Sequence, residues 1–185
     1  MIGFYFTFLA VILAGLGARD QVLVAALSRH HGQRPAVLIV AAVVCVLSAA
    51  LAAWLGKSVS PLLGPEARTF LGGLALVFAG GESLLIAPRR DPAEPSRSLA
   101  ALAIILTSHQ LTDAARFLVF GIAVATSAPI PAAVGGALGG LVVLGAAWAL
   151  PSHFAHRHLR STRRLIGAML ALIGLYVCLS AMGKL

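Results

Sequence analysis

Six long apolar runs constrain the fold of this chain more than any other feature. A helix needs roughly 20 apolar residues to cross a bilayer. The runs have about that length or more, and they cover residues 2–27, 36–55, 67–87, 99–125, 132–150 and 164–182. Only 11% of the residues are charged, against about 25% in a soluble domain, and no run alternates as a barrel strand would. The sequence therefore predicts an all-α integral membrane protein with six transmembrane helices.

Basic residues are distributed unevenly over the connections between these runs. The first, third and fifth connections, residues 28–35, 88–98 and 151–163, together with the start of the last run, contain Arg29, Arg34, Arg89, Arg90, Arg97, Arg157, Arg160, Arg163 and Arg164. The other exposed segments contain only Lys57, Arg68 and Lys184. The positive-inside rule then predicts that these three connections are cytoplasmic and that both termini lie outside, in the cell inner (plasma) membrane. Topology accounts for the net charge of +8, so no nucleic-acid partner is expected.

The two halves of the chain resemble each other. In each, a run with polar residues is followed by a Pro-initiated run that ends in Trp, and then by a glycine-containing run. Gly73 and Gly80 have the same spacing as Gly167 and Gly174. Three spans per half is an odd number, so the second half would be inserted upside-down, as in many secondary transporters. We predict two inverted three-helix repeats, residues 1–87 and 99–185, joined by a cytoplasmic hydrophilic linker at residues 88–98.

Two polar clusters interrupt the apolar runs. The first is Arg19, Asp20 and Gln21, and the second lies within residues 107–116. Ionisable groups inside a membrane usually face a partner or a water-filled cavity. We expect the clusters to meet at the centre of the bundle and to line a transport pathway, with the candidate residues Arg19, Asp20, Gln21, His109, Gln110, Asp113 and Arg116.

The chemistry of these clusters admits two interpretations. On one continuous helix, His109 and Asp113 would share a face, and such a pair could relay protons. Across the bundle, Asp20 with Arg116 and Arg19 with Asp113 would tie the halves together. The sequence leaves a transport pathway and a structural ion-pair lock equally open.

The motifs of common enzyme classes are absent from the sequence. It contains no Gly-x-Ser-x-Gly elbow, no His-Glu-x-x-His, no phosphate-binding glycine loop and no Cys-x-x-Cys. Cys45 and Cys178 fall in apolar runs and are expected to be buried. We therefore expect neither an enzyme nor a cofactor, whereas glycine-rich helix faces leave a homo-oligomer possible.

The layout resembles the Gdt-type family of Ca²⁺/Mn²⁺–proton exchangers, in which each half carries Glu-x-Gly-Asp-Lys/Arg-Thr/Ser in its first helix. Gly15-Leu16-Gly17-Ala18-Arg19-Asp20-Gln21 is similar to the first motif, with matches at Gly17, Arg19 and Gln21. In Thr112-Asp113-Ala114-Ala115-Arg116, only Arg116 matches the second. Both motif carboxylates are replaced in each half.

The resemblance implies exchange of a divalent cation for protons across the lipid bilayer. A divalent cation requires several oxygen ligands, usually including carboxylates. With the motif acids replaced, Asp20 and Asp113 are the candidate metal ligands, and the nearby arginines would oppose a dication. The sequence therefore predicts a divergent exchanger-like secondary transporter. The alternatives are an exporter of a small anionic or zwitterionic solute, and a transport-inactive assembly or regulatory protein.

Overall fold

The computed structural model describes residues 1–86, 98–155 and 158–184, and the part of the chain that it describes is helical without strands. The first half contains α1 (Ile2–Gly15), α2 (Arg19–His31), α3 (Pro35–Val59), the short 3₁₀ helix η1 (Ser60–Leu62) and α4 (Pro65–Leu85). The second contains α5 (Leu99–Leu111), α6 (Ala114–Thr126), α7 (Pro129–Ala149), the 3₁₀ helix η2 (His153–Ala155) and α8 (His158–Ala181). The predicted linker 88–98 lies outside the described residues except for Ser98.

Within the described residues, three helices are long and apolar enough to cross a membrane: Pro35–Leu62, Pro129–Ala149 and Arg160–Ala181. The α1–α2 pair would supply a fourth span, bent by 59°. The helix α4 has 21 residues but includes Glu66, Arg68 and Glu82, and it is not among these candidates. The prediction of a helical, multi-pass membrane protein is confirmed. Helix length and composition support three or four of the six predicted spans.

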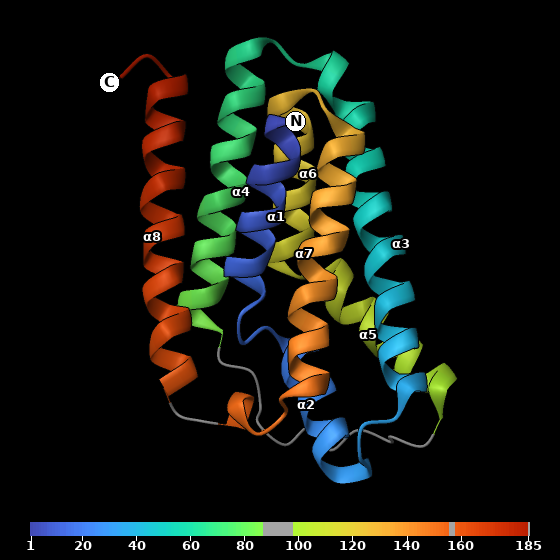
Figure 1. Cartoon of the computed structure of the whole chain (residues 1–185). Helices are drawn as coiled ribbons and strands as arrows, with labels where there is room; N and C mark the ends of the chain where they lie inside the picture. The colour runs from blue at the N-terminus through green and yellow to red at the C-terminus, as the bar shows by residue number, and fades with distance from the viewer. Residues whose placement is uncertain (87–97, 156–157, 185) are drawn as a thin grey trace.

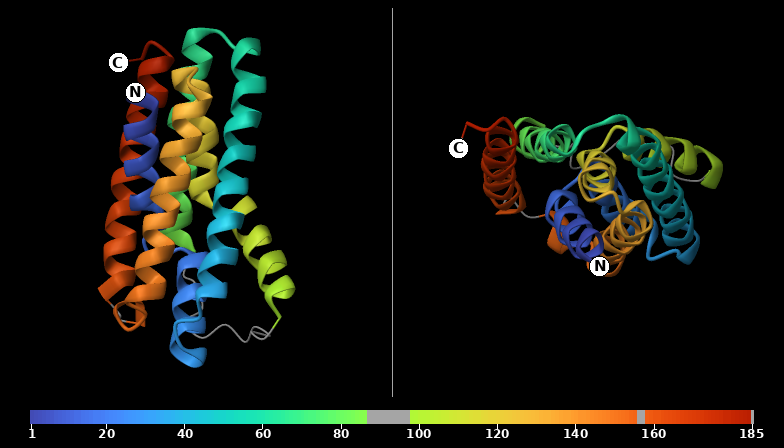
Figure 2. Two further views of the ribbon diagram at one scale, coloured as in Figure 1. Left: turned by 45° about the vertical axis from the view of Figure 1, so that its right-hand side comes forward. Right: turned by 90° about the horizontal axis from the view of Figure 1, so that it is seen from above.

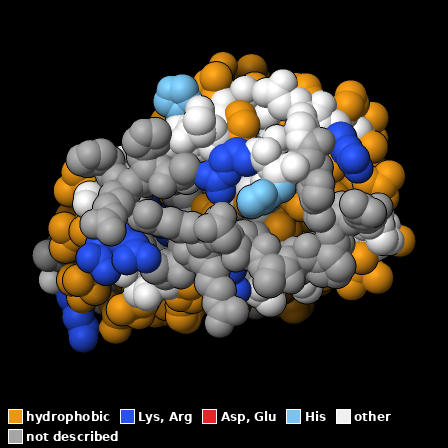
Figure 3. Space-filling view, turned by 90° about the horizontal axis from the view of Figure 1, so that it is seen from below, with side chains coloured by type: hydrophobic (Ala, Val, Ile, Leu, Met, Phe, Trp, Pro, Cys, Tyr) orange, Lys and Arg blue, Asp and Glu red, His pale blue; other side chains and the backbone are white. Residues whose placement is uncertain are grey.

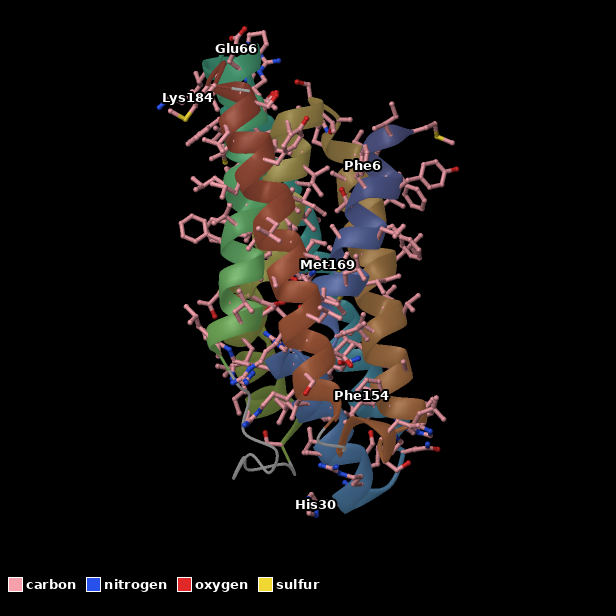
Figure 4. All side chains as sticks on the ribbon, turned by 90° about the vertical axis from the view of Figure 1, so that its left-hand side faces the viewer. Phe6, His30, Glu66, Phe154, Met169 and Lys184 are labelled. Carbon is pink, nitrogen blue, oxygen red and sulfur yellow. The ribbon has the colours of Figure 1, made fainter. Side chains whose placement is uncertain are left out.

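The helices run side by side along one long axis (Figure 1). Both termini lie at one end, together with the α3–α4 and α6–α7 connections, and the α2–α3 and α7–α8 connections lie at the other (Figures 1 and 2). Glu66 and Lys184 mark the first end and His30 the second (Figure 4). Seen from the second end, Lys and Arg side chains lie on the surface (Figure 3). The exposed arginines Arg34, Arg160 and Arg164 belong to segments at this end.

Close glycine contacts join the two halves along α4 and α8. A Cβ added at Gly73 would lie 2.9 Å from the carbonyl oxygen of Gly174, and one added at Gly80 would lie 2.5 Å from that of Gly167. Glycine at these positions therefore lets the two backbones approach more closely than any side chain would permit.

Two predicted helices are interrupted, which corrects the expectation of continuous spans over residues 2–27 and 99–125. The first break, between Gly15 and Ala18, turns at Gly17, whose φ is +73°. The second falls at Thr112 and Asp113, where the Asp113 backbone becomes extended, with φ −88° and ψ 143°. The hydropathy pattern shows neither break. The two short helices on either side of each break together read as one continuous apolar run. Other boundaries also differ from the prediction; in particular, α2 extends through Arg29, and α8 begins early enough to include Arg163.

Replacing Gly17 by alanine is expected to destabilise the protein by about 1–2 kcal/mol, because a left-handed backbone conformation is less stable by that amount for a residue with a Cβ. Thermal unfolding in detergent would measure the loss. Gly145→Ala in α7 is the matched control, since a Cβ there meets nothing within 4 Å. Equal stability of the two variants would contradict the strained turn.

Candidate polar site at the helix breaks

The two polar clusters predicted from the sequence lie in contact inside the bundle. Gln110 at the end of α5 donates from Nε2 to Oδ2 of Asp20 in the first turn of α2, over 3.2 Å. Asp20 is 8% exposed and Gln110 is fully buried. Residues 90 positions apart in the sequence therefore share one buried hydrogen bond, and it joins the two halves beside their helix breaks.

Arg116 is connected to Asp20 through Gln110, where a direct ion pair was expected. Arg116 Nη2 donates to Gln110 Oε1 over 3.2 Å, and Arg116 Nε donates to Ser48 Oγ over 2.7 Å. Ser48 Oγ in turn donates to Gln110 Oε1 over 2.9 Å. A further bond runs from Arg116 Nη2 to Cys45 Sγ over 3.3 Å. One guanidinium thus links α6 to α3 and α5, and the described groups that accept its hydrogen bonds are neutral.

Arg19 pairs with Glu82, whereas Asp113 was its expected partner. Its Nη2 lies 3.5 Å from Glu82 Oε1, and the Arg19 side chain is 35% exposed. The same carboxylate oxygen lies 3.8 Å from Nη2 of Arg163, a buried arginine of α8. Glu82 therefore lies between two cations, one from each half of the chain.

The second helix break depends on the same glutamate. Glu82 Oε2 accepts a hydrogen bond from the backbone N–H of Ala114, the first residue of α6, over 2.8 Å. The first N–H groups of a helix have no partner within it and carry its positive dipole end. Glu82 therefore satisfies one such group with a negative charge, and it holds the start of α6 against α4.

His109 and Asp113 do not share a helical face, because the helix ends between them. Asp113 occupies the N-cap position of α6 without a side-chain capping bond, and it is 7% exposed. Within the described part of the chain, the buried Nδ1 of His109 has no hydrogen-bond partner. The expected His109–Asp113 pair thus assumed a helix that the structure interrupts.

The buried side chain of Gln21 stabilises the first helix break. Its Oε1 accepts from the backbone N–H of Gly17 over 2.5 Å, and its Nε2 donates to the carbonyl oxygen of Val143 in α7 over 3.1 Å. This fully buried side chain therefore stabilises the turn between α1 and α2 and anchors it to the second half.

Sequence reasoning missed four members of this site. Glu82 and Arg163 complete a set of three acids and three arginines around the breaks, namely Asp20, Glu82, Asp113, Arg19, Arg116 and Arg163. Ser48 and Cys45 supply acceptors from α3. A lone acid in the apolar run 67–87 was the available signal for Glu82, whereas Arg163 was assigned to a loop.

The site holds several oxygen donors, but its acids are dispersed. Among the residues that the structure describes, no three His, Cys, Asp or Glu side chains lie close enough together to hold a metal ion. In this conformation the polar cluster is a network of hydrogen bonds and ion pairs.

Comparison with known proteins identifies the first half of the chain. Residues 3–91 match the family model GDT1, described as divalent cation/proton antiporter GDT1. Neither a curated protein nor a solved structure matches the chain. The description names a transport activity rather than an enzymatic one. The resemblance to the Gdt-type family inferred from the motif around Gly17 and Arg19 is confirmed over these residues, which are similar to the divalent cation/proton antiporter GDT1.

Proposed function

We propose that this protein is a secondary transporter of the cell inner membrane, built from two inverted halves with the polar site on its pathway. The order of elements supports this architecture. Each half consists of two short helices separated by a break, followed by two long helices. The proposed halves are residues 1–87 and 99–185, and their odd-numbered connections would face the cytoplasm.

The glycine contacts between α4 and α8 support the inversion. The proposed repeat superposes Gly73 on Gly167 and Gly80 on Gly174. A two-fold axis that exchanges equivalent residues would convert the contact of Gly73 with Gly174 into a contact of Gly167 with Gly80. Both contacts are present.

The observation that carries the transport proposal is the Gln110 bridge between Asp20 and Arg116. It lies where two discontinuous helices meet, and transporters commonly bind substrate and coupling ions at such discontinuities. Following the family description, we propose that the substrate is a divalent cation, Mn²⁺ or Ca²⁺, exchanged for protons. Asp20 and Asp113 would supply carboxylate oxygens, Gln110 an amide oxygen, and Gln21 and His109 would lie along the route.

A second candidate substrate follows from the arginines. Within the described chain, Nε, Nη1 and Nη2 of the buried Arg163 and Nη1 of Arg116 lack hydrogen-bond partners. Buried guanidinium groups favour anionic ligands that can accept these hydrogen bonds. This observation favours a small anionic or zwitterionic solute, for which Arg116 and Arg163 would supply donors.

Flux measurements in liposomes would test the proposal. We expect proton-coupled Mn²⁺ or Ca²⁺ uptake that falls about tenfold or more in Asp20→Asn and Asp113→Asn, because each variant removes a carboxylate ligand. Glu66→Gln is the matched control, since it removes the charge of an exposed acid in the first turn of α4.

The outcomes distinguish the candidates. Cation flux that is unchanged in both Asn variants would contradict the assigned pathway. Uptake of an amino acid or phosphate without cation flux would favour the anionic or zwitterionic substrate. If the unsubstituted protein transports neither the cations nor the amino acid or phosphate, a non-transporting assembly or regulatory role is favoured.

A further inference from the structure

Polar contacts join the two halves at the outer end of the bundle, the end that carries both termini. The turn between α6 and α7 passes through Ser127, whose φ is +50°. Ser127 Oγ lies 3.1 Å from Oγ of Ser60, the residue that follows α3, and it accepts a hydrogen bond over 3.0 Å from Nη1 of Arg68 in α4. These three side chains form the outer polar contact. Because Ser60 and Arg68 belong to the first half and Ser127 to the second, the contact holds the halves together at this end.

A similar set of contacts lies at the opposite, inner end. Gln33, between α2 and α3, donates from Nε2 to the carbonyl oxygen of Ala149 at the end of α7, over 2.9 Å. Trp148 Nε1 donates to the carbonyl oxygen of Arg34 over 3.2 Å. These four residues form the inner polar contact. The proposed inverted repeat relates it to the outer one, since each time the connection between the second and third helices of one half bonds to the end of the third helix of the other.

From the outer polar contact, a packed seam between α3 and α6 leads to the polar site. A Cβ added at Gly56 of α3 would lie 2.8 Å from the Cβ of Ala123 in α6. Further along the seam, Ala52 belongs to the same buried apolar cluster as Ala123. The seam ends where Arg116 Nε donates to Ser48 Oγ. Apolar packing therefore separates Arg116 from the outer end along this seam.

The equivalent seam in the other half lies between α2 and α7. Leu23 and Leu27 of α2 and Leu144 of α7 belong to one buried apolar cluster. The seam ends where Gln21 Nε2 donates to the carbonyl oxygen of Val143. Each seam thus runs from a polar contact at one end of the bundle, through apolar packing, to a buried polar side chain that lies beside a helix break.

We propose that the outer and inner polar contacts are the two gates of the transporter, which open in turn as α3 parts from α6 or α2 parts from α7. This inference rests on the proposed function, because alternating access requires one gate on each side of the site. The backbone of Ser127 supports it. A left-handed conformation is unfavourable for a residue with a Cβ, so Ser60 and Arg68 hold a turn that relaxes when the outer contact breaks.

Cys45 is a built-in reporter of both seams. It is fully buried, and its Sγ accepts a hydrogen bond from Arg116 at the base of the outer seam. It also belongs to the same buried cluster as Leu27 and Leu144 of the inner seam. Opening of either seam is therefore expected to expose this thiol. In the full chain, Cys178→Ala leaves Cys45 as the single cysteine.

Labelling of Cys45 by a charged, membrane-impermeant thiol reagent would test the proposal, in spheroplasts and in inside-out vesicles of the same expressing cells. Arg68→Met should raise the labelling rate about tenfold from the face that carries the termini, because it removes a hydrogen bond from a charged donor. Gln33→Leu should raise it about fivefold from the opposite face, because a neutral hydrogen bond is weaker. Lys57→Met is the matched control for Arg68→Met, since Lys57 is an exposed basic residue in the last turn of α3.

The face from which labelling rises separates a gate from a general loosening of the bundle. Labelling that rises equally from both faces, or that changes in neither variant, would overturn the proposal. The result is also independent of the flux measurements, because labelling requires no transported ion. One-sided labelling without flux would support the gates and contradict the proposed substrates, whereas flux with two-sided labelling would support transport and contradict these gates.

Discussion

Replacing Gly80 by alanine is expected to destabilise the protein by about 3 kcal/mol, the upper end of the range for overpacked cores. A Cβ at this position would stand 2.5 Å from the backbone nitrogen of Ala171 and 2.5 Å from the carbonyl oxygen of Gly167. Both obstacles are backbone atoms of α8, which cannot rotate away as a side chain would. The helices α4 and α8 must therefore separate to admit one methyl group.

Gly81→Ala is the matched control for this prediction. Gly81 is the next residue of α4, and a Cβ there meets nothing within 4 Å. Alanine is favoured over glycine in a helix by roughly 0.5–1 kcal/mol, so this variant should be as stable as the parent or slightly more so. Thermal unfolding followed by circular dichroism in detergent would measure both. Two variants of similar stability would contradict the close approach of α4 and α8.

The second large effect is expected at Glu82. Glu82→Gln should destabilise the protein by about 3–5 kcal/mol, the usual result of removing one member of a buried ion pair. The substitution keeps an oxygen that can accept from Ala114, but it removes the charge between Arg19 and Arg163. Unfolding measurements on Glu82→Gln and Glu66→Gln would separate this loss from a general effect of charge, since an exposed surface change usually stays within about 0.5 kcal/mol.

A double variant would establish the reason for that loss. Arg163 is 4% exposed, so Arg163→Met removes a buried cation that Glu82→Gln leaves without its partner. The combined variant should therefore lose less stability than the two single losses added together, because residues in contact are not additive. Strict additivity would show that Glu82 and Arg163 do not stabilise each other.

The apolar runs predicted the fold class because hydrophobic length is a direct requirement of the bilayer. The two polar clusters were expected to meet, since polar groups in lipid must find partners within the protein, and Asp20 and Gln110, one from each cluster, are in contact. The interruption at Thr112 and Asp113 could not be read from the sequence, because neither glycine nor proline occurs there. At Gly17 a glycine was present, but isolated glycines are frequent in membrane helices.

The partners within the site were harder to predict than its location. Arg116 was expected to bond to Asp20, but the intervening Gln110 amide can donate to one and accept from the other at once. In the sequence, Glu82 is only a lone acid near the end of the apolar run 67–87. Its link to Ala114 and Arg163 depends on how α4 packs against α6 and α8, and pairing between distant spans leaves no local pattern.

The two helix breaks differ in where their backbone groups find partners. The first is completed by Gln21, which follows it by four residues, whereas the second relies on Glu82, 32 residues before Ala114. During synthesis the ribosome delivers Glu82 before Ala114, so the acceptor can already be in the membrane when α6 is inserted. The earlier half can thus act as a template for the start of α6.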